Sequence, residues 1–235
     1  MQATEKVLEV GEFKLNCATA GKGKNLLLLH GSDHREDWRV WEPLLPLGDA
    51  FSLVMPDMVG YGKSTKPEET PDHVLQAGAI RDLLDRLSVE KTAVVGTGWG
   101  GQVALELALK SPALVEAVVL ISSAFDKAQL PRLGKLRKPT LIVYAEDDMV
   151  TQLKAGYLLR DAIGTSRLEV LEQVAYDPAQ DFTTSHKLQK FRAPQVMQLV
   201  RLFLSNPEAM VAEPPELEEE LKGMAMKKQE PEKGS

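Results

Sequence analysis

From residue 25 onward, short apolar segments alternate with longer amphipathic ones, and this alternation restricts the chain to few folds. Asn25–His30 is a nearly continuous apolar run, typical of a strand that is buried on both faces of a sheet. Before it, Lys6–Val10 and Phe13–Ala18 flank a Gly-Glu turn and predict a hairpin. We therefore predict an α/β fold in which a mostly parallel sheet carries helices on both faces. Further strands are expected at Phe51–Met55, Thr92–Val95, Ala117–Ile121, Thr140–Tyr144 and Arg167–Leu171, and helices near Trp38–Leu45, Pro71–Leu87, Gly101–Ser111, Thr151–Ile163 and Ala193–Leu204.

The domain organisation is predicted from the point where this periodic pattern ends. The chain has 235 residues, of which 43% are hydrophobic, enough for one large core over residues 1–204. Residues 205–235 contain eight glutamates and four lysines, with prolines that interrupt any helix. We expect a disordered acidic tail. The alternative is a short amphipathic helix that docks on a partner through Leu217, Leu221 and Met224.

The charge, the length of the apolar runs, and the cysteine and histidine content restrict the partners, the location and the metal chemistry that we expect. A net charge of -6 gives no electrostatic attraction for nucleic acid or an anionic membrane. The longest apolar run, Leu26–Leu29, is too short to span a bilayer. The single cysteine, Cys17, cannot form an intramolecular disulfide, and no leader pattern precedes it, so we expect a cytoplasmic protein. The four histidines lack metal-ligand spacing, and we expect neither a metal nor a cofactor.

A glycine-rich turn, Gly96-Thr97-Gly98-Trp99-Gly100-Gly101, joins a predicted strand to a predicted helix. This turn resembles the nucleophile elbow of the α/β-hydrolase fold, where small flanking residues allow a sharp turn that lifts the nucleophile above the sheet. The resemblance implies that fold for about residues 25–204. The helical lid that the family often inserts is minimal or absent here, because only a polar loop connects Ile121 to Thr140. Three further motifs in the family's order are His30-Gly31, Asp57-x-x-Gly60-x-Gly62-x-Ser64 and Glu146-Asp147-Asp148.

The resemblance also shows what this chain lacks at the nucleophile position. That position holds Gly98, which has no side chain that could attack a carbonyl. The Trp-Gly-Gly ending is similar to the elbow of dehalogenases and epoxide hydrolases, where the missing group would be a carboxylate. By the family's register Asp148 is a relic of the catalytic acid, and Tyr176 stands in the histidine position. A phenol is a poor general base at neutral pH. An insertion blurs this register, and His186 remains the alternative.

The oxyanion hole consists of backbone groups, so the resemblance implies that it can persist. Its two N–H groups would come from Trp99 and from Ser32, which follows Gly31. Together with Tyr176, these residues are the predicted ligand-binding site. We expect His30 to be a buried structural residue, and the Asp57 motif to bond local backbone amides.

The sequence therefore predicts an α/β-hydrolase-like pseudoenzyme that binds a small molecule or a protein partner. The alternative is an active esterase or lyase with relocated groups, using Thr97 or Ser32 with His34 or His186. A third possibility is a scaffold that acts through its surface and acidic tail. On the predicted register, a serine at position 98 stays inactive unless Tyr176 is also changed to histidine.

Overall fold

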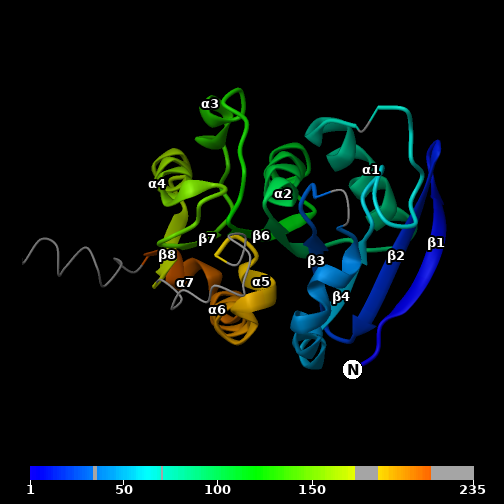
Figure 1. The fold of residues 1–235 in the computed structure, drawn as a ribbon, viewed down its shortest axis with the longest axis horizontal. Coiled ribbons are helices and arrows are strands. Elements are labelled where there is room, and N and C mark those ends of the chain that lie inside the picture. The colour runs from blue at the N-terminus through cyan, green and yellow to red at the C-terminus, as the bar shows by residue number, and fades with distance from the viewer. Residues whose placement is uncertain (34–35, 70, 173–184, 213–235) are drawn as a thin grey trace, which may run out of the picture.

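The computed structural model describes residues 1–33, 36–69, 71–172 and 185–212. Its centre is an eight-stranded sheet with strand order β1-β2-β4-β3-β5-β6-β7-β8 (Figure 1). β2 pairs antiparallel with both β1 and β4, and all other neighbours are parallel. The strands are β1 (Thr4–Val10), β2 (Phe13–Gly21), β3 (Lys24–Leu29), β4 (Phe51–Pro56), β5 (Thr92–Thr97), β6 (Val115–Ile121), β7 (Thr140–Ala145) and β8 (Ser166–Leu171). The predicted leading hairpin and mostly parallel sheet are confirmed.

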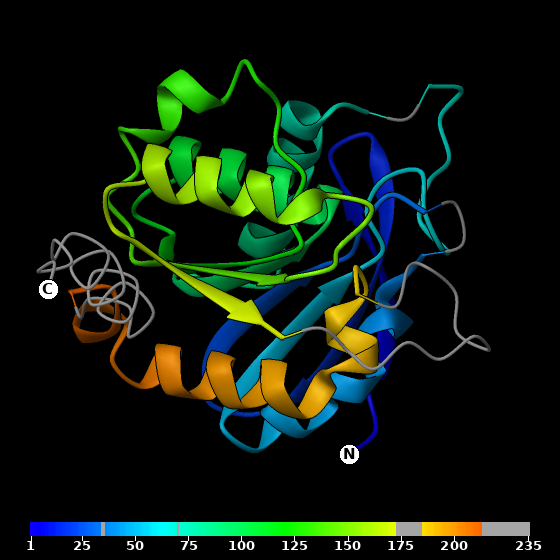
Figure 2. The same ribbon diagram turned by 60° about the vertical axis from the view of Figure 1, so that its left-hand side comes forward.

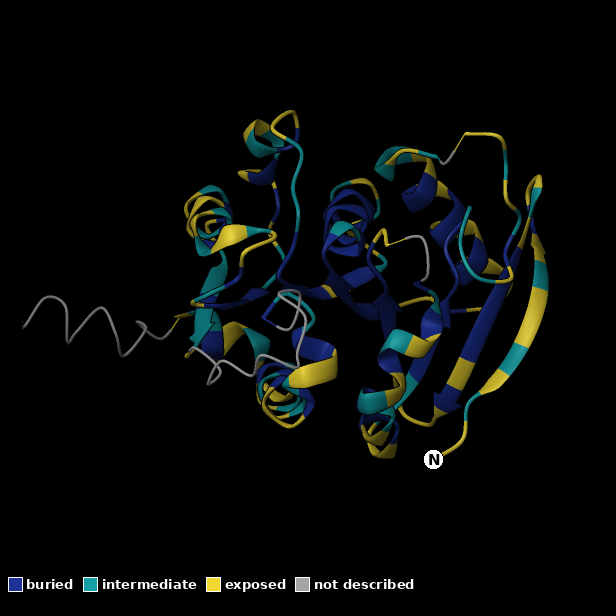
Figure 3. Cartoon of the chain, in the orientation of Figure 1, coloured by how far each residue is buried: buried dark blue, intermediate teal, exposed yellow. Residues whose placement is uncertain are grey.

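Helices cover both faces of this sheet, as predicted (Figure 2). On one face α1, α2, α3 and α4 pack against a core rich in leucine and valine. On the other face η1, α5, α6 and α7 enclose a second core that contains Trp41 and Phe203. The central strands β5, β6 and β7 are almost wholly buried, whereas the edge strand β1 is largely exposed (Figure 3). The helices are η1 (Trp38–Asp49), α1 (His73–Arg86), α2 (Trp99–Lys110), α3 (Leu130–Leu133), α4 (Gln152–Ala162), α5 (Leu188–Phe191), α6 (Ala193–Ser205) and α7 (Pro207–Ala212).

The register of the parallel strands gathers their carboxyl ends at one edge. Leu29 of β3 pairs with Gly96 of β5, and Thr97 of β5 pairs with Ile121 of β6. Ligand sites of open α/β sheets form in the loops beyond such an edge. The segments that follow β3, β5, β6 and β7 therefore lie next to one another.

Two elements differ from the sequence prediction. The segment predicted as a helix near Trp38–Leu45 is a 3₁₀ helix, η1, because Pro43 and Pro46 remove the N–H groups that an α-helix would need. Helix α7 lies in the segment predicted as a tail, and its Met210 is only 8% exposed against the second core. Packed structure thus continues beyond residue 204, to Ala212.

The connection between β6 and β7 contains a single short helix, α3, and no larger helical insertion. Arg132 of α3 forms a bidentate ion pair with the buried Glu106 of α2, at 2.8 and 3.1 Å. This ion pair holds the connection on the side of the sheet that α2 covers. A connection with one short helix agrees with the minimal lid that the sequence predicts. Among the helices that the structure describes, none is long and apolar enough to cross a membrane.

Candidate functional site

The glycine-rich turn forms a tight elbow between β5 and α2. Gly98 is the connecting residue, with φ +52° and ψ −120°. Its carbonyl oxygen accepts hydrogen bonds from Ala124 N and Gly101 N, at 2.8 and 3.2 Å. The flanking glycines are required by close approach, because a Cβ on Gly100 would overlap the backbone carbonyl oxygens at the end of β3. The local sequence therefore dictates this turn.

Gly98 leaves open the space that a side chain at the elbow would fill. A Cβ built on Gly98 would lie 3.4 Å from Nε2 of His186 and 3.8 Å from Cα of Gly31. Both distances are ordinary van der Waals contacts, so a side chain would fit without displacing a neighbour. The positive φ of Gly98 is the remaining obstacle, since residues with a Cβ rarely adopt it.

His186 points into this space and contacts a buried carboxylate on its other side. Its Nδ1 lies 3.2 Å from Oδ2 of Asp148, which is 4% exposed in the loop after β7. The other carboxylate oxygen, Oδ1, accepts hydrogen bonds from the backbone amides of Val150 and Thr151, at 2.8 and 3.0 Å. The Thr151 hydroxyl lies 2.8 Å from Oδ2. Asp148 is thus held rigidly beside the imidazole.

The charge of Asp148 orients the imidazole of His186, whose other ring nitrogen, Nε2, lies toward Gly98. Burial raises the pKa of Asp148, but hydrogen bonds from His186 and the Thr151 amide outweigh it and bring the pKa down to about 2. Asp148 is therefore ionised at neutral pH and accepts the proton of Nδ1. With the Nδ1 proton on that side, a neutral imidazole would present the lone pair of Nε2 to the open space, which is the orientation a general base requires.

The geometry bears on the predicted histidine position. Asp148, predicted as a relic of the catalytic acid, contacts the imidazole of His186. Tyr176, assigned to the histidine position, lies outside the described residues, as does His34. The geometry supports His186, the alternative that the sequence analysis left open. The sequence signal was weak because the segment before His186 has no regular pattern that fixes its register.

The two predicted oxyanion residues each follow a glycine of the site, since Trp99 comes after Gly98 and Ser32 after Gly31. Gly31 is the residue whose Cα faces the open space, and Ser32 follows it as an exposed residue. Trp99 is the first residue of α2, so its amide has no acceptor within the helix. Tyr61 packs between Trp99 and His30, with ring centroids 6.0 and 5.1 Å away. The structure thus brings Gly31, Trp99 and His186 to one point.

Two other predicted roles are confirmed, and one candidate nucleophile is unsuited to attack. His30 is buried, accepts a hydrogen bond from Met58 N and bonds the Gly31 carbonyl, and burial lowers its pKa. Asp57 accepts hydrogen bonds from the backbone amides of Trp38 and Lys63, at 2.8 Å each. Thr97 is 3% exposed and its hydroxyl donates a hydrogen bond to Oε1 of Gln189 at 3.3 Å, so the hydroxyl is buried and already bonded.

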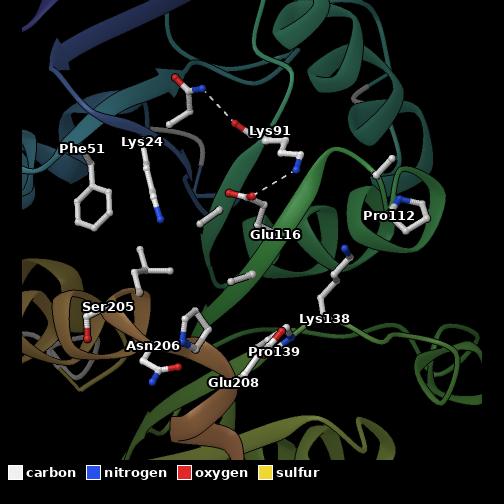
Figure 4. A pocket seen from close by; sticks show the side chains of 16 residues that line it. Lys24, Phe51, Lys91, Pro112, Glu116, Lys138, Pro139, Ser205, Asn206 and Glu208 are labelled. Carbon is white, nitrogen blue, oxygen red and sulfur yellow. Dashed lines mark hydrogen bonds and ion pairs between the residues drawn. The ribbon is translucent and has the colours of Figure 1, made fainter.

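A hollow of about 470 Å³ lies at the opposite edge of the sheet, near the amino ends of the parallel strands (Figure 4). Lys24, Lys91 and Lys138 line it together with Glu116 and Glu208. Lys91 and Glu116 lie 4.0 Å apart, a distance typical of a weak surface pair. No group of histidine, cysteine, aspartate or glutamate side chains within the described residues could hold a metal ion. The elbow is therefore the site with organised chemistry.

Comparison with known proteins identifies the class that this fold and site define. The model of the Alpha/beta hydrolase family matches residues 26–221. The chain belongs to the α/β hydrolase family.

Curated relatives include a soluble epoxide hydrolase of Corynebacterium, 34% identical over 113 residues that cover 48% of this chain and 39% of that protein. A fluoroacetate dehalogenase of Burkholderia is 32% identical over 122 residues, covering 49% of this chain and 40% of the relative. An uncharacterized protein of Mycobacterium tuberculosis is 31% identical over 163 residues, covering 63% of this chain and 45% of the relative. The chain spans less than half the length of these relatives.

Solved structures show the same fold. A predicted CIB-like hydrolase from Thermoplasma acidophilum superimposes with a TM-score of 0.76 at 21% identity, covering 88% of this chain and 99% of that one. A serine hydrolase involved in carbazole degradation superimposes with a TM-score of 0.77 at 19% identity, covering 87% of this chain and 99% of that one.

Proposed function

We propose that this protein binds a small ligand at the elbow without forming a covalent intermediate, as a pseudoenzyme of the α/β hydrolase family. The observation that carries this proposal is the absence of a side chain at Gly98, where a Cβ would lie 3.4 Å from Nε2 of His186. A hydrolase that uses covalent catalysis needs an activated nucleophile at that point, and glycine supplies no oxygen or sulfur. The surrounding acid–base and backbone groups remain available for binding.

The ligand group that fits this site is a carbonyl or a carboxylate. The amide of Trp99 at the start of α2 provides a hydrogen-bond donor and the positive end of a helix dipole. His186 donates from Nε2 when protonated and accepts there when neutral. The connection between β6 and β7 contains one short helix, α3, and no larger helical insertion. We infer that a protein ligand would have to present such a group to occupy the same point.

The pair of His186 and Asp148 supports a second candidate, hydrolysis by an activated water. A water in the space above Gly98 would give a proton to Nε2 while its oxygen bonds to the bound carbonyl carbon. The tetrahedral intermediate would then break its bond to the leaving group, which would take the proton back from Nε2. Asp148 would stabilise the imidazolium that forms, as in other histidine–carboxylate pairs. This route needs no side chain at position 98 and no covalent intermediate.

Hydrolysis of p-nitrophenyl acetate by the purified chain distinguishes the two candidates. The binding proposal predicts no turnover above buffer, in the unchanged protein and in His186→Ala alike. Turnover that persists through purification and disappears in His186→Ala would overturn it in favour of water activation. The matched control is Lys138→Ala at the opposite hollow, which should leave either result unchanged.

A further inference from the structure

The segment that carries His186 spans the elbow from one side to the other. His186 reaches Asp148, which follows β7, while the next residue, Lys187, reaches the loop that follows β3. In the sheet, β5 lies between β3 and β7, and Gly98 is at the end of β5. Residues 186 and 187 therefore bridge the two walls of the site across the point where a nucleophile would stand.

Lys187 is held by two carboxylates of the same loop. Its Nζ lies 3.3 Å from Oδ2 of Asp33 and 3.5 Å from Oε1 of Glu36. The Lys187 side chain is 24% exposed, so its ion pairs with Asp33 and Glu36 are less accessible to water than ordinary surface ion pairs. Both carboxylates follow Gly31, the glycine that faces Gly98.

The buried carboxylate of Glu36 favours a position of the Lys187 ammonium close to it. Glu36 is 7% exposed, and its Oε2 has no hydrogen-bond donor among the residues that the structure describes. That oxygen lies beside Gly31, where a Cβ would approach it to 2.5 Å. A buried carboxylate is costly unless a positive charge compensates it. Within the described part of the chain, Lys187 is the cation paired with Glu36.

We propose that Lys187 is a positioning residue that fixes His186 between Asp148 and Gly98. Leu188 is fully buried and Gln189 bonds Thr97, so the residues after Lys187 are anchored to the core below. Those anchors fix the start of α5, whereas Lys187 fixes the sideways placement of the segment against the Gly31 loop. Without that tether the imidazole can turn away from Asp148. The inference concerns the geometry of the pair and does not depend on which ligand the site takes.

Nitrogen-15 NMR of the histidine side chains at pH 8.5 tests this in the 235-residue chain. The unchanged protein should show His186 in a single tautomer with the proton on Nδ1, together with a downfield proton signal from its hydrogen bond to Asp148. Asp148→Asn should abolish that signal and so assign it. Lys187→Met should mix the two tautomers and weaken the signal, and Lys187→Arg should restore both.

The matched control is Lys190→Met, which removes an ammonium that lies over the Phe191 ring, 5.1 Å from its centroid. It should leave the His186 spectrum unchanged. If Lys187→Met fails to fold, Asp33→Asn combined with Glu36→Gln removes the partners of Lys187 and should give the same mixed tautomers. A folded Lys187→Met, or a folded double variant, with the spectrum of the unchanged protein would overturn the proposal. Its outcome is separate from that of the esterase assay, since neither ligand nor turnover is required.

Discussion

Replacing Gly98 by serine should rebuild a complete triad with one substitution. The Cβ of the new residue would lie 3.4 Å from Nε2 of His186, so the hydroxyl one bond further can reach the imidazole. Asp148 already holds that imidazole at 3.2 Å. The additional change of Tyr176 that the sequence register required becomes unnecessary, because His186 supplies the base.

The stability change in this variant follows from the backbone at Gly98. A Cβ there meets no atom closer than 3.4 Å, so the cost is conformational and not steric. A residue with a side chain at φ +52° and ψ −120° is strained by about 1–3 kcal/mol, and the restricted unfolded chain offsets about 0.4–1 kcal/mol of that. The middle values of these two ranges leave a net loss of about 1–2 kcal/mol. The melting temperature should fall by about 2–8 °C.

The assay is labelling by a fluorophosphonate probe together with a thermal melt. Gly98→Ser should be labelled at least about tenfold faster than Gly98→Ala, which carries the same strain without a hydroxyl. Adding His186→Ala to Gly98→Ser should return labelling to the Gly98→Ala rate. A folded Gly98→Ser protein that stays unlabelled would refute the reasoning about His186, and an unchanged melting temperature would refute the reasoning about strain.

Three further outcomes are expected. The pKa of Asp148 is about 2 in the folded chain, against a usual value of 3.8. The ionised carboxylate should therefore add up to about 2 kcal/mol to the free energy of unfolding at neutral pH. This contribution is lost as the pH falls from about 5 toward 2. Urea denaturation should therefore show the stability gap between the unchanged protein and Asp148→Asn narrowing over that range, and a constant gap would contradict it. Burial raises the pKa of Cys17 to about 12, so DTNB should modify this thiol only after unfolding, and fast reaction in native buffer would argue against its burial. Ending the chain after Ala212 should leave the melting temperature unchanged. Ending the chain before Pro207 removes the buried Met210 and should lower the melting temperature by about 4–8 °C. Equal melting temperatures for the two truncated proteins would show that α7 adds no stability.

The sequence by itself determined the fold and the elbow, because both depend on local patterns. Apolar runs of strand length and amphipathic segments of helical length set the order of elements, and parallel strands with helical crossovers allow few topologies. The glycines around Gly98 are required by contacts with adjacent backbone, so their spacing predicts the turn. Asp148 was predictable from the family resemblance, since it lies in the loop that follows the buried strand β7.

Only the tertiary structure decided which side chain faces the turn at Gly98. His186 lies 38 residues after Asp148 along the chain, and no periodic pattern in the segment before it indicates which residue returns to the site. Its place is decided by Lys187 meeting two carboxylates beyond β3 and by Leu188 entering the core, contacts that exist only once the sheet has formed. Spacing along a sequence encodes a local turn, whereas contacts between distant segments depend on how the intervening chain packs. The turn at Gly98 therefore follows from the local sequence, whereas the place of the imidazole beside it follows from tertiary packing.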